Sequence, residues 1–181
     1  MPKIVIATAC FLLAGWLALP SGHAQEKTIE PMVVKYDGLK DVVAKNKGKV
    51  VVVDFWTIDC IPCKTKSLPH LVEIQKKWAS RGLVTASVLI DGYQSKTADE
   101  LKVVAGRFLT RINAADSINL VLDKDAPFGG DKIRFATVPC IYVFDRRGKW
   151  TRFGGGEETN VLDDIGYNKM DELVDTLLNE K

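Results

Sequence analysis

Residues 51–64 decide the fold, and they read VVVDFWTIDCIPCK: an apolar run followed by a Cys-x-x-Cys turn formed by Cys60 and Cys63. The run predicts a central strand that is buried on both faces, and the turn opens a predicted helix. Two thiols at this spacing can close a small disulfide ring. A helix N-terminus at the first sulfur favours its thiolate, the form that attacks other disulfides. The stretch therefore predicts a strand–turn–helix unit that carries a redox-active cysteine pair.

Length and composition indicate a single globular domain. The 181 residues are 46% hydrophobic and 27% charged, which is sufficient for a sizeable core. The formal net charge is +2, and Lys and Arg are interspersed with Asp and Glu rather than gathered in a basic stripe. Nucleic acid is therefore disfavoured as a partner.

The N-terminus has the pattern of a secretory signal peptide. Lys3 precedes an apolar stretch at residues 4–19, and a small-x-small triplet suited to signal peptidase ends at Ala24. Cleavage there would make residues 1–24 a signal peptide and give a periplasmic or otherwise exported protein. The alternative is an uncleaved membrane anchor at residues 4–19, although a spanning helix needs about 20 residues. Only this alternative predicts contact with a membrane.

The cysteine count fits thiol chemistry better than a disulfide scaffold. Export would place the chain in an oxidising compartment, where disulfides persist. Without the signal peptide the chain retains Cys60, Cys63 and Cys140. An odd number excludes a fully paired scaffold and leaves a thiol that is either reactive or buried and inert.

Beyond a polar leader at residues 25–35, strands and helices alternate. Hydrophobic periodicity predicts strands at 32–36, 50–55, 83–90 and 118–122, and helices at 39–45, from the cysteine turn to Gly82 with a kink at Pro69, and at 97–112. A surface loop at 123–135, a hairpin of strands 140–145 and 149–153, and a last helix at 169–178 follow. Alternation implies parallel crossovers, and the hairpin adds antiparallel strands. We therefore expect an α/β domain with a central mixed β-sheet flanked by helices on both faces.

Three motifs resemble those of thioredoxin-like proteins: Val-Asp-Phe-Trp at 53–56, Cys-x-Pro-Cys-Lys at 60–64, and Val138-Pro139 before the hairpin. The exported setting, the long third helix and the turn at 144–148 resemble most closely the TlpA/ResA-type thiol–disulfide oxidoreductases. The resemblance covers residues 36–181. It implies a thioredoxin-like domain, protein thiol or disulfide substrates, an upstream thiol–disulfide electron donor, and no cofactor other than the cysteine pair.

The resemblance also assigns catalytic roles. Cys60 would be the nucleophile, and Cys63 would resolve the mixed disulfide. Asp54 matches a buried carboxylate beneath the cysteines; burial would raise its pKa and make it a candidate proton acceptor for Cys63. The alternative for Asp54 is a hydrogen bond to a loop without any part in proton transfer.

Five further residues are candidates for substrate binding. Trp56 matches an aromatic that packs against the active-site turn, and packing is its simpler interpretation. Pro62 restrains the turn, while Ile61 adds a small apolar patch at its mouth. Val138-Pro139 matches a cis-proline whose neighbouring backbone would pair with an extended substrate chain.

Two departures from the family pattern bear on the reaction. Asp59 stands where the family usually has Trp, and a carboxylate there would raise the pKa of the Cys60 thiol and shift the couple towards the reducing side. We therefore expect a reductant. Lys66 stands where cytochrome-maturation members often carry an acidic residue, which weakens an assignment to apocytochrome reduction.

Cys140 directly follows the expected cis-proline, where the family usually has Thr or another small residue. It could be a small buried core residue, or a thiol that competes for a disulfide with the pair. It could also join Cys60 and Cys63 in a three-thiolate site for a soft metal such as Cu(I), which gives a metal-binding protein as the alternative function. A structural zinc site needs four N or S ligands, and the chain after the signal offers these three thiols and His70. Such a site would have to gather all four of these side chains, and we expect no metal in the redox protein.

Overall fold

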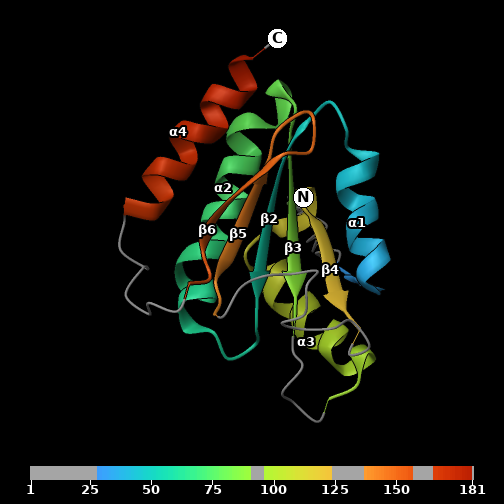
Figure 1. The fold of residues 1–181 in the computed structure, drawn as a ribbon. Coiled ribbons are helices and arrows are strands. Elements are labelled where there is room, and N and C mark those ends of the chain that lie inside the picture. Colours follow the sequence, from blue (N-terminus) through green and yellow to red (C-terminus); the bar gives the residue numbers. More distant parts are fainter. Residues whose placement is uncertain (1–27, 91–95, 124–136, 157–164, 181) are drawn as a thin grey trace, which may run out of the picture.

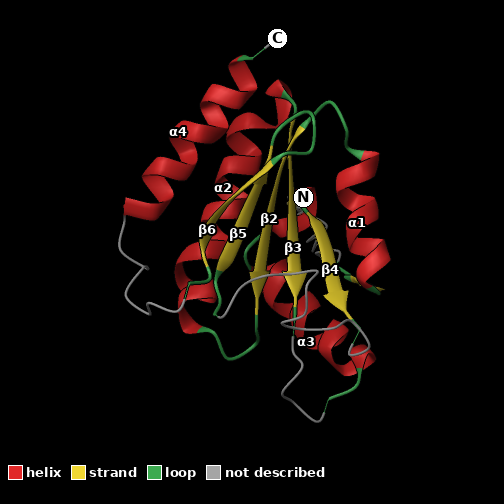
Figure 2. Ribbon diagram, in the orientation of Figure 1, coloured by secondary structure: helices red, strands yellow, loops and turns green. Residues whose placement is uncertain are grey.

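The computed structural model describes residues 28–90, 96–123, 137–156 and 165–180 (Figure 1). These residues form a six-stranded sheet with the order β1-β4-β3-β2-β5-β6. The strands are β1 (Met32–Val34), β2 (Val50–Trp56), β3 (Leu83–Leu89), β4 (Ile118–Leu122), β5 (Cys140–Phe144) and β6 (Trp150–Gly154). Neighbours among β1 to β4 are parallel, whereas β5 and β6 form an antiparallel hairpin beside β2 (Figure 2). The predicted mixed sheet is confirmed.

The order of the strands determines which face each helix covers. The helices are α1 (Tyr36–Lys45), α2 (Leu68–Trp78), α3 (Ala98–Arg111) and α4 (Ile165–Asn179). The chain crosses the sheet in one direction from β2 through β3 to β4, so right-handed crossovers place α2 and α3 on the same face. It returns from β1 to β2 in the opposite direction, so α1 covers the other face. α4 joins the face of α2, and Figure 1 shows α1 on the opposite side of the sheet.

Two hydrophobic cores lie on the two faces of the sheet, and β2 contributes to both. Val50, Val52 and Trp56 pack with α2, α3 and α4, whereas the alternate residues Val51, Val53 and Phe55 pack towards α1. Burial of every β2 residue explains its continuous apolar sequence. Asp54 is the one charged residue in this strand. The alternation of side chains along β2 places its carboxyl on the α2 face.

The helix after the cysteine turn is less regular than the single kinked helix that the sequence predicts. It opens with one π-helical turn, Cys63–Ser67, and α2 begins at Leu68. Pro69 lies in the first turn of α2, where its missing N–H is tolerated, and the widened turn ends just before α2, at Ser67. A short 3₁₀ turn, Ala79–Arg81, follows α2, and Gly82 ends it with φ of +94°.

The structure departs from the remaining predictions at the two ends of the domain. α4 begins at Ile165, one turn before the predicted start at residue 169. Part of the polar leader is held in place: the Ile29 N–H donates to Thr110 Oγ1 of α3 at 2.8 Å. The expected signal peptide and the loop at 123–135, except its first residue, lie outside the described residues. Among the helices of the described ranges, none has the length and apolarity needed to span a bilayer.

Candidate active site

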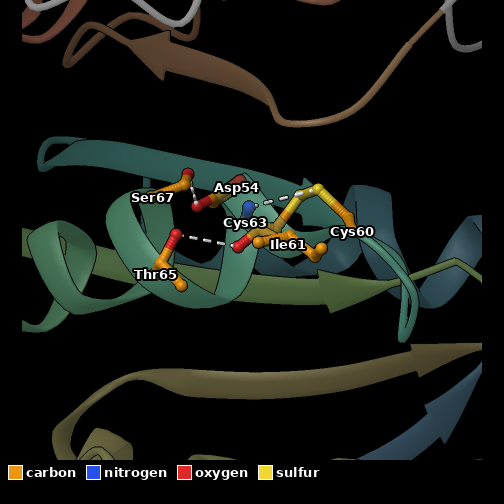
Figure 3. Close-up of a disulfide and its surroundings, with 6 residues drawn as sticks. All are labelled: Asp54, Cys60, Ile61, Cys63, Thr65 and Ser67. Carbon is orange, nitrogen blue, oxygen red and sulfur yellow. Dashed lines mark hydrogen bonds between the residues drawn. A yellow bond between two sulfur atoms is a disulfide. The ribbon is translucent and has the colours of Figure 1, made fainter.

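Cys60 and Cys63 form a disulfide where the chain leaves β2 and enters the π-helical turn, with their Cα atoms 5.3 Å apart (Figure 3). Cys60 is partly exposed, whereas Cys63 is fully buried. The backbone N–H of Cys63 donates to Cys60 Sγ at 3.1 Å. The same donor would stabilise negative charge on Cys60 once the disulfide opens. The two sulfurs therefore differ both in access to solvent and in stabilisation of a thiolate.

Local hydrogen bonds hold the turn around the pair. The Cys60 N–H donates to the Thr57 carbonyl at 3.2 Å, and the Cys60 carbonyl accepts from the Lys64 N–H at 3.3 Å. Thr65 Oγ1 donates to the Ile61 carbonyl at 3.0 Å (Figure 3). Ile61 itself is 69% exposed. The turn thus presents an apolar side chain to solvent beside the accessible sulfur.

Asp54 is fully buried on the same face of the sheet as the π-helical turn. Ser67 Oγ donates to Asp54 Oδ2, as Figure 3 shows, whereas Oδ1 has no hydrogen-bond partner among the described residues. Burial raises the pKa of this carboxyl to about 7, against the opposing effect of the Ser67 hydrogen bond. Such a carboxyl can accept or release a proton near neutral pH.

Two residues that the sequence analysis did not single out extend this site. Ser67 lies one turn after Cys63, and its hydroxyl is the donor to Asp54; Tyr167 lies on α4, where its ring packs edge-on against that of His70. Burial raises the pKa of Tyr167. The spacing of Ser67 from the cysteines could have indicated it, whereas Tyr167 precedes the predicted start of the last helix.

Pro139 lies at the same end of the sheet as the cysteine turn. Cys140 pairs with Phe55, so Pro139 stands one position further along, beside the end of β2. The Val138–Pro139 peptide bond is cis. Gly154 on β6 makes the close packing here possible, because a Cβ at this position would lie 2.6 Å from the Pro139 carbonyl oxygen.

Cys140 and Trp56 lie in different cores, on opposite faces of the sheet. The Cys140 side chain belongs to the core on the α1 face, opposite the core that contains Cys63. Burial raises the pKa of the Cys140 thiol to about 12. Trp56 is fully buried and packs 5.6 Å from the ring of Phe108, which favours the simpler interpretation of Trp56 as a packing residue.

The alternative three-thiolate site finds no support in the structure. Within residues 28–90, 96–123, 137–156 and 165–180, no three His, Cys, Asp or Glu side chains gather closely enough to hold a metal ion. The three thiols do not gather because Cys140 and Cys63 lie on opposite faces of the sheet. A Cu(I) site built from Cys60, Cys63 and Cys140 would need one of these side chains to cross the sheet.

Comparison with known proteins gives relatives of low identity. No family model matches the chain. The DipZ protein of Mycobacterium bovis is 28% identical over 137 residues, which are 74% of this chain and 17% of DipZ. The chain thus spans less than a fifth of that relative. The thiol-disulfide oxidoreductase ResA of Bacillus thuringiensis is 26% identical over 131 residues, covering 71% of this chain and 67% of ResA.

A solved structure agrees with the fold. The crystal structure of a thiol-disulfide isomerase from Corynebacterium glutamicum matches with a TM-score of 0.57 and 22% identity, over 87% of this chain and 99% of that chain. At this identity the match supports the architecture alone. It shows that the chain has a thioredoxin-like fold, and the sequence relatives agree with the resemblance seen in the motifs, because the chain is similar to a ResA thiol-disulfide oxidoreductase.

Proposed function

We propose that the chain is an exported thiol–disulfide oxidoreductase that reduces disulfides in protein substrates through Cys60-Ile61-Pro62-Cys63. The asymmetry of the pair is the observation that carries this proposal. Cys60 is partly exposed and accepts a hydrogen bond from the Cys63 N–H, while Cys63 is buried on the same face as Asp54. An accessible nucleophile and a buried resolving thiol are what disulfide exchange requires.

The first step is attack by the reduced Cys60. Its thiolate attacks one sulfur of a substrate disulfide, and a Cys60–substrate mixed disulfide forms as the substrate disulfide breaks. The other substrate sulfur leaves as a thiolate and takes a proton from solvent. The N–H of Cys63 and the N-terminal end of the helical segment favour the attacking thiolate.

The second step resolves the mixed disulfide. The Cys63 thiol loses its proton to the Asp54 carboxylate, and the Cys63 thiolate attacks Cys60 Sγ. The Cys60–Cys63 disulfide forms, and the second substrate sulfur leaves and is protonated. The substrate has then gained two electrons and two protons. A pKa of about 7 suits Asp54 to this transfer, because the carboxyl is ionised often enough to accept a proton and basic enough to hold it.

Substrate binding is assigned to the surface around Cys60. Ile61 would contact apolar substrate side chains, since it is 69% exposed at the mouth of the turn. Pro62 would hold the turn, and the backbone beside Val138 and Pro139 would pair with an extended substrate chain. A disordered or unfolded segment with an exposed disulfide suits this surface better than a folded domain, because strand pairing needs free backbone groups.

The reducing direction rests on Asp59. Its carboxylate directly precedes Cys60 and is exposed, so it would oppose formation of the Cys60 thiolate and weaken stabilisation of the reduced pair. Each cycle leaves the pair oxidised, so a thiol–disulfide donor has to return two electrons. The apolar segment at residues 4–19 supports export, with the mature domain starting after residue 24; membrane attachment through that segment is the alternative.

Cysteine variants test the proposal. Cys60→Ser should abolish reduction of insulin disulfides, whereas Cys63→Ser should accumulate a mixed disulfide with the substrate, detectable by mass spectrometry. Cys140→Ser is the matched control and should keep the activity. Equal residual turnover in Cys60→Ser and Cys63→Ser would contradict the assigned roles. A reduction potential near that of strong periplasmic oxidants, about −120 mV, would refute the reducing direction.

A further inference from the structure

Two turns meet at the end of the sheet opposite the cysteine pair. One joins α1 to β2 at residues 46–49 and the other joins β5 to β6 at residues 145–149; both lie at the top of Figure 1, whereas the cysteine turn lies at the bottom. The Gly48 N–H donates to the Arg146 carbonyl at 3.0 Å, and Arg146 Nη1 donates to the Gly48 carbonyl at 2.9 Å. Arg146 Nη2 also donates to the Leu178 carbonyl of α4 at 3.3 Å. These bonds hold the two turns side by side.

Four exposed cations lie on these turns, and within the described ranges none of them forms an ion pair with an acidic side chain. This basic patch consists of Lys47, Lys49, Arg147 and Lys149. The acidic side chains beside it are engaged elsewhere. Asp145 Oδ1 accepts from the backbone N–H groups of Arg147 and Lys149 at 2.9 and 2.8 Å, and Asp41 pairs with Lys45 at 3.3 Å. The patch therefore keeps a surplus of positive charge, even with the exposed Glu180 after α4 counted.

An aromatic side chain borders the basic patch. Trp150 directly follows Lys149 as the first residue of β6, and it is 54% exposed. Its ring packs edge-on against that of Tyr142, with centroids 5.2 Å apart, and the rest of the ring is open to solvent. Tryptophan is the residue type that favours the boundary between lipid headgroups and acyl chains, because its ring is apolar and its N–H is polar. Exposed cations beside an exposed indole form a surface that suits an anionic bilayer.

We propose that the basic patch and Trp150 dock the domain on an anionic lipid surface. Each Lys or Arg attracts the phosphate of a headgroup, and the indole ring enters the boundary beneath the headgroups. Attraction to the surface falls off within about 10 Å at 0.1 M salt, so the cations that face the lipid decide the binding. The small net charge of +2 for the whole chain is therefore compatible with docking at one end.

Docking at this surface turns the redox pair away from the lipid. β2 leads from the turn at 46–49 to the cysteine end over seven residues, a distance of about 20 Å for an extended strand. Cys60 and the exposed Ile61 then face the aqueous phase, where they stay accessible to substrates outside the bilayer. The docking itself does not depend on the proposed function.

The experiment measures whether Trp150 of the full chain enters a lipid surface. Vesicles with brominated acyl chains are made from phosphatidylcholine, either alone or with about one third phosphatidylglycerol, because bromine quenches the fluorescence of a tryptophan that lies in the bilayer. The Trp150 signal is the difference between wild type and Trp150→Phe, in which Trp16, Trp56 and Trp78 cancel. We expect quenching of this signal by the phosphatidylglycerol vesicles at low salt. The quenching should be lost without phosphatidylglycerol or at about 0.5 M salt.

Charge variants connect the quenching with the basic patch. At the salt concentration where half of the wild-type Trp150 signal is quenched, Lys47→Gln/Lys49→Gln should lower the ratio of docked to undocked protein about thirty-fold. Lys66→Gln/Lys169→Gln is the matched control, because it removes the same charge from exposed positions on the π-helical turn and the start of α4. It should keep the wild-type ratio. The apolar segment at residues 4–19 is common to all variants, so its own affinity for the bilayer cancels.

Either of two results overturns the inference. One is a Trp150 signal that phosphatidylglycerol vesicles do not quench, which is also the outcome for a patch that binds an acidic protein instead. The other is quenching that does not depend on salt or on the charges of Lys47 and Lys49. Insulin reduction tests the orientation, since docked and undocked protein should react at the same rate and a loss on docking would contradict it. A protein that reduces no insulin in either state refutes the proposed function and leaves the fluorescence result standing.

Discussion

Two groups of buried polar side chains lie on the α2 face of the sheet, and only one of them satisfies its hydrogen bonds. In the first, Gln75 Oε1 accepts from the Thr85 N–H at 2.9 Å and from its hydroxyl at 2.8 Å. Asn119 donates to the carbonyls of Ala114 and Ser117 and accepts from Ser87. These groups are neutral and paired, as buried polar groups in a stable core usually are.

The second group is Asp54 with Ser67, whose hydroxyl donates to Oδ2. Asp54 stands in the same row as Ser87 and Asn119, because β2, β3 and β4 place the three residues in register. Yet it is ionisable, one of its oxygens lacks a partner among the described residues, and burial raises its pKa to about 7. The paired group maintains the sheet, whereas the unpaired carboxyl has a cost in stability and fits the proton transfer that we propose for it.

Removing the charge from the second group should give the largest effect. Asp54→Asn keeps the shape of the side chain but cannot take the proton of Cys63, so insulin reduction at pH 8 should fall by about a hundred-fold or more. The loss should shrink below pH 7, where the wild-type carboxyl is itself protonated. Stopped-flow measurement from pH 5 to 9 checks this, with Ser87→Ala from the same row as the control. Equal rates in Asp54→Asn and wild type at pH 8 would remove Asp54 from the mechanism.

The same substitution should change how stability depends on pH. Between about pH 4 and pH 7 the unfolded Asp54 ionises, whereas the folded one stays protonated, so the wild type loses stability as pH rises through this window. At about 1.4 kcal/mol per pH unit, the loss amounts to about 4 kcal/mol. Asp54→Asn should lack this component, so its stability relative to wild type should increase from pH 4 to 7. Urea unfolding of the disulfide forms at pH 4, 5.5 and 8 measures it, and a constant difference would contradict the raised pKa.

A substitution in the paired group should act on stability alone. Gln75→Met has a similar volume but leaves the Thr85 N–H without its acceptor, which should cost about 1–3 kcal/mol of unfolding free energy. Because no charge is involved, the cost should be the same at pH 5.5 and pH 8, and the pH profile of insulin reduction should keep its midpoint. A shifted midpoint would show that the two groups are coupled across the sheet.

Much of this fold can be predicted from the sequence. The apolar run of β2, the cysteine turn and the regular alternation of strands and helices indicate a mixed sheet, because burial on both faces and crossover connections leave local patterns. Cys60 and Cys63 stand out for the same reason, since they lie in one short turn, whereas the role expected of the nearby Asp54 comes from the resemblance to thioredoxin-like proteins. The turn at the end of β2 separates a partly exposed cysteine, Cys60, from a buried cysteine, Cys63, and a buried carboxyl, Asp54.

The remaining features depend on contacts between distant segments. Tyr167 packs against His70 from a distant part of the sequence, and no local periodicity records that contact. Gly166 beside Tyr167 also obscures the start of α4, since glycine weakens a predicted helix. The sequence could not predict which face of the sheet Cys140 lies on, because that depends on the register between β5 and β2.

Cys140 offers the smallest expected effect and the sharpest contrast with Cys63. Both side chains are fully buried, but Cys63 lies on the face of Asp54, whereas Cys140 packs among apolar residues with its thiol pKa raised to about 12. A thiol that stays protonated cannot compete for the disulfide. Cys140→Ala should therefore leave the insulin reduction rate unchanged and cost roughly 1 kcal/mol in urea unfolding, through lost packing. A Cys60–Cys140 disulfide in the Cys63→Ser variant would contradict this, since it requires the buried thiol to cross the sheet. If instead the Cys140→Ala rate is unchanged, the position of a buried cysteine relative to the Asp54 carboxyl, rather than its burial, explains why Cys63 reacts and Cys140 does not.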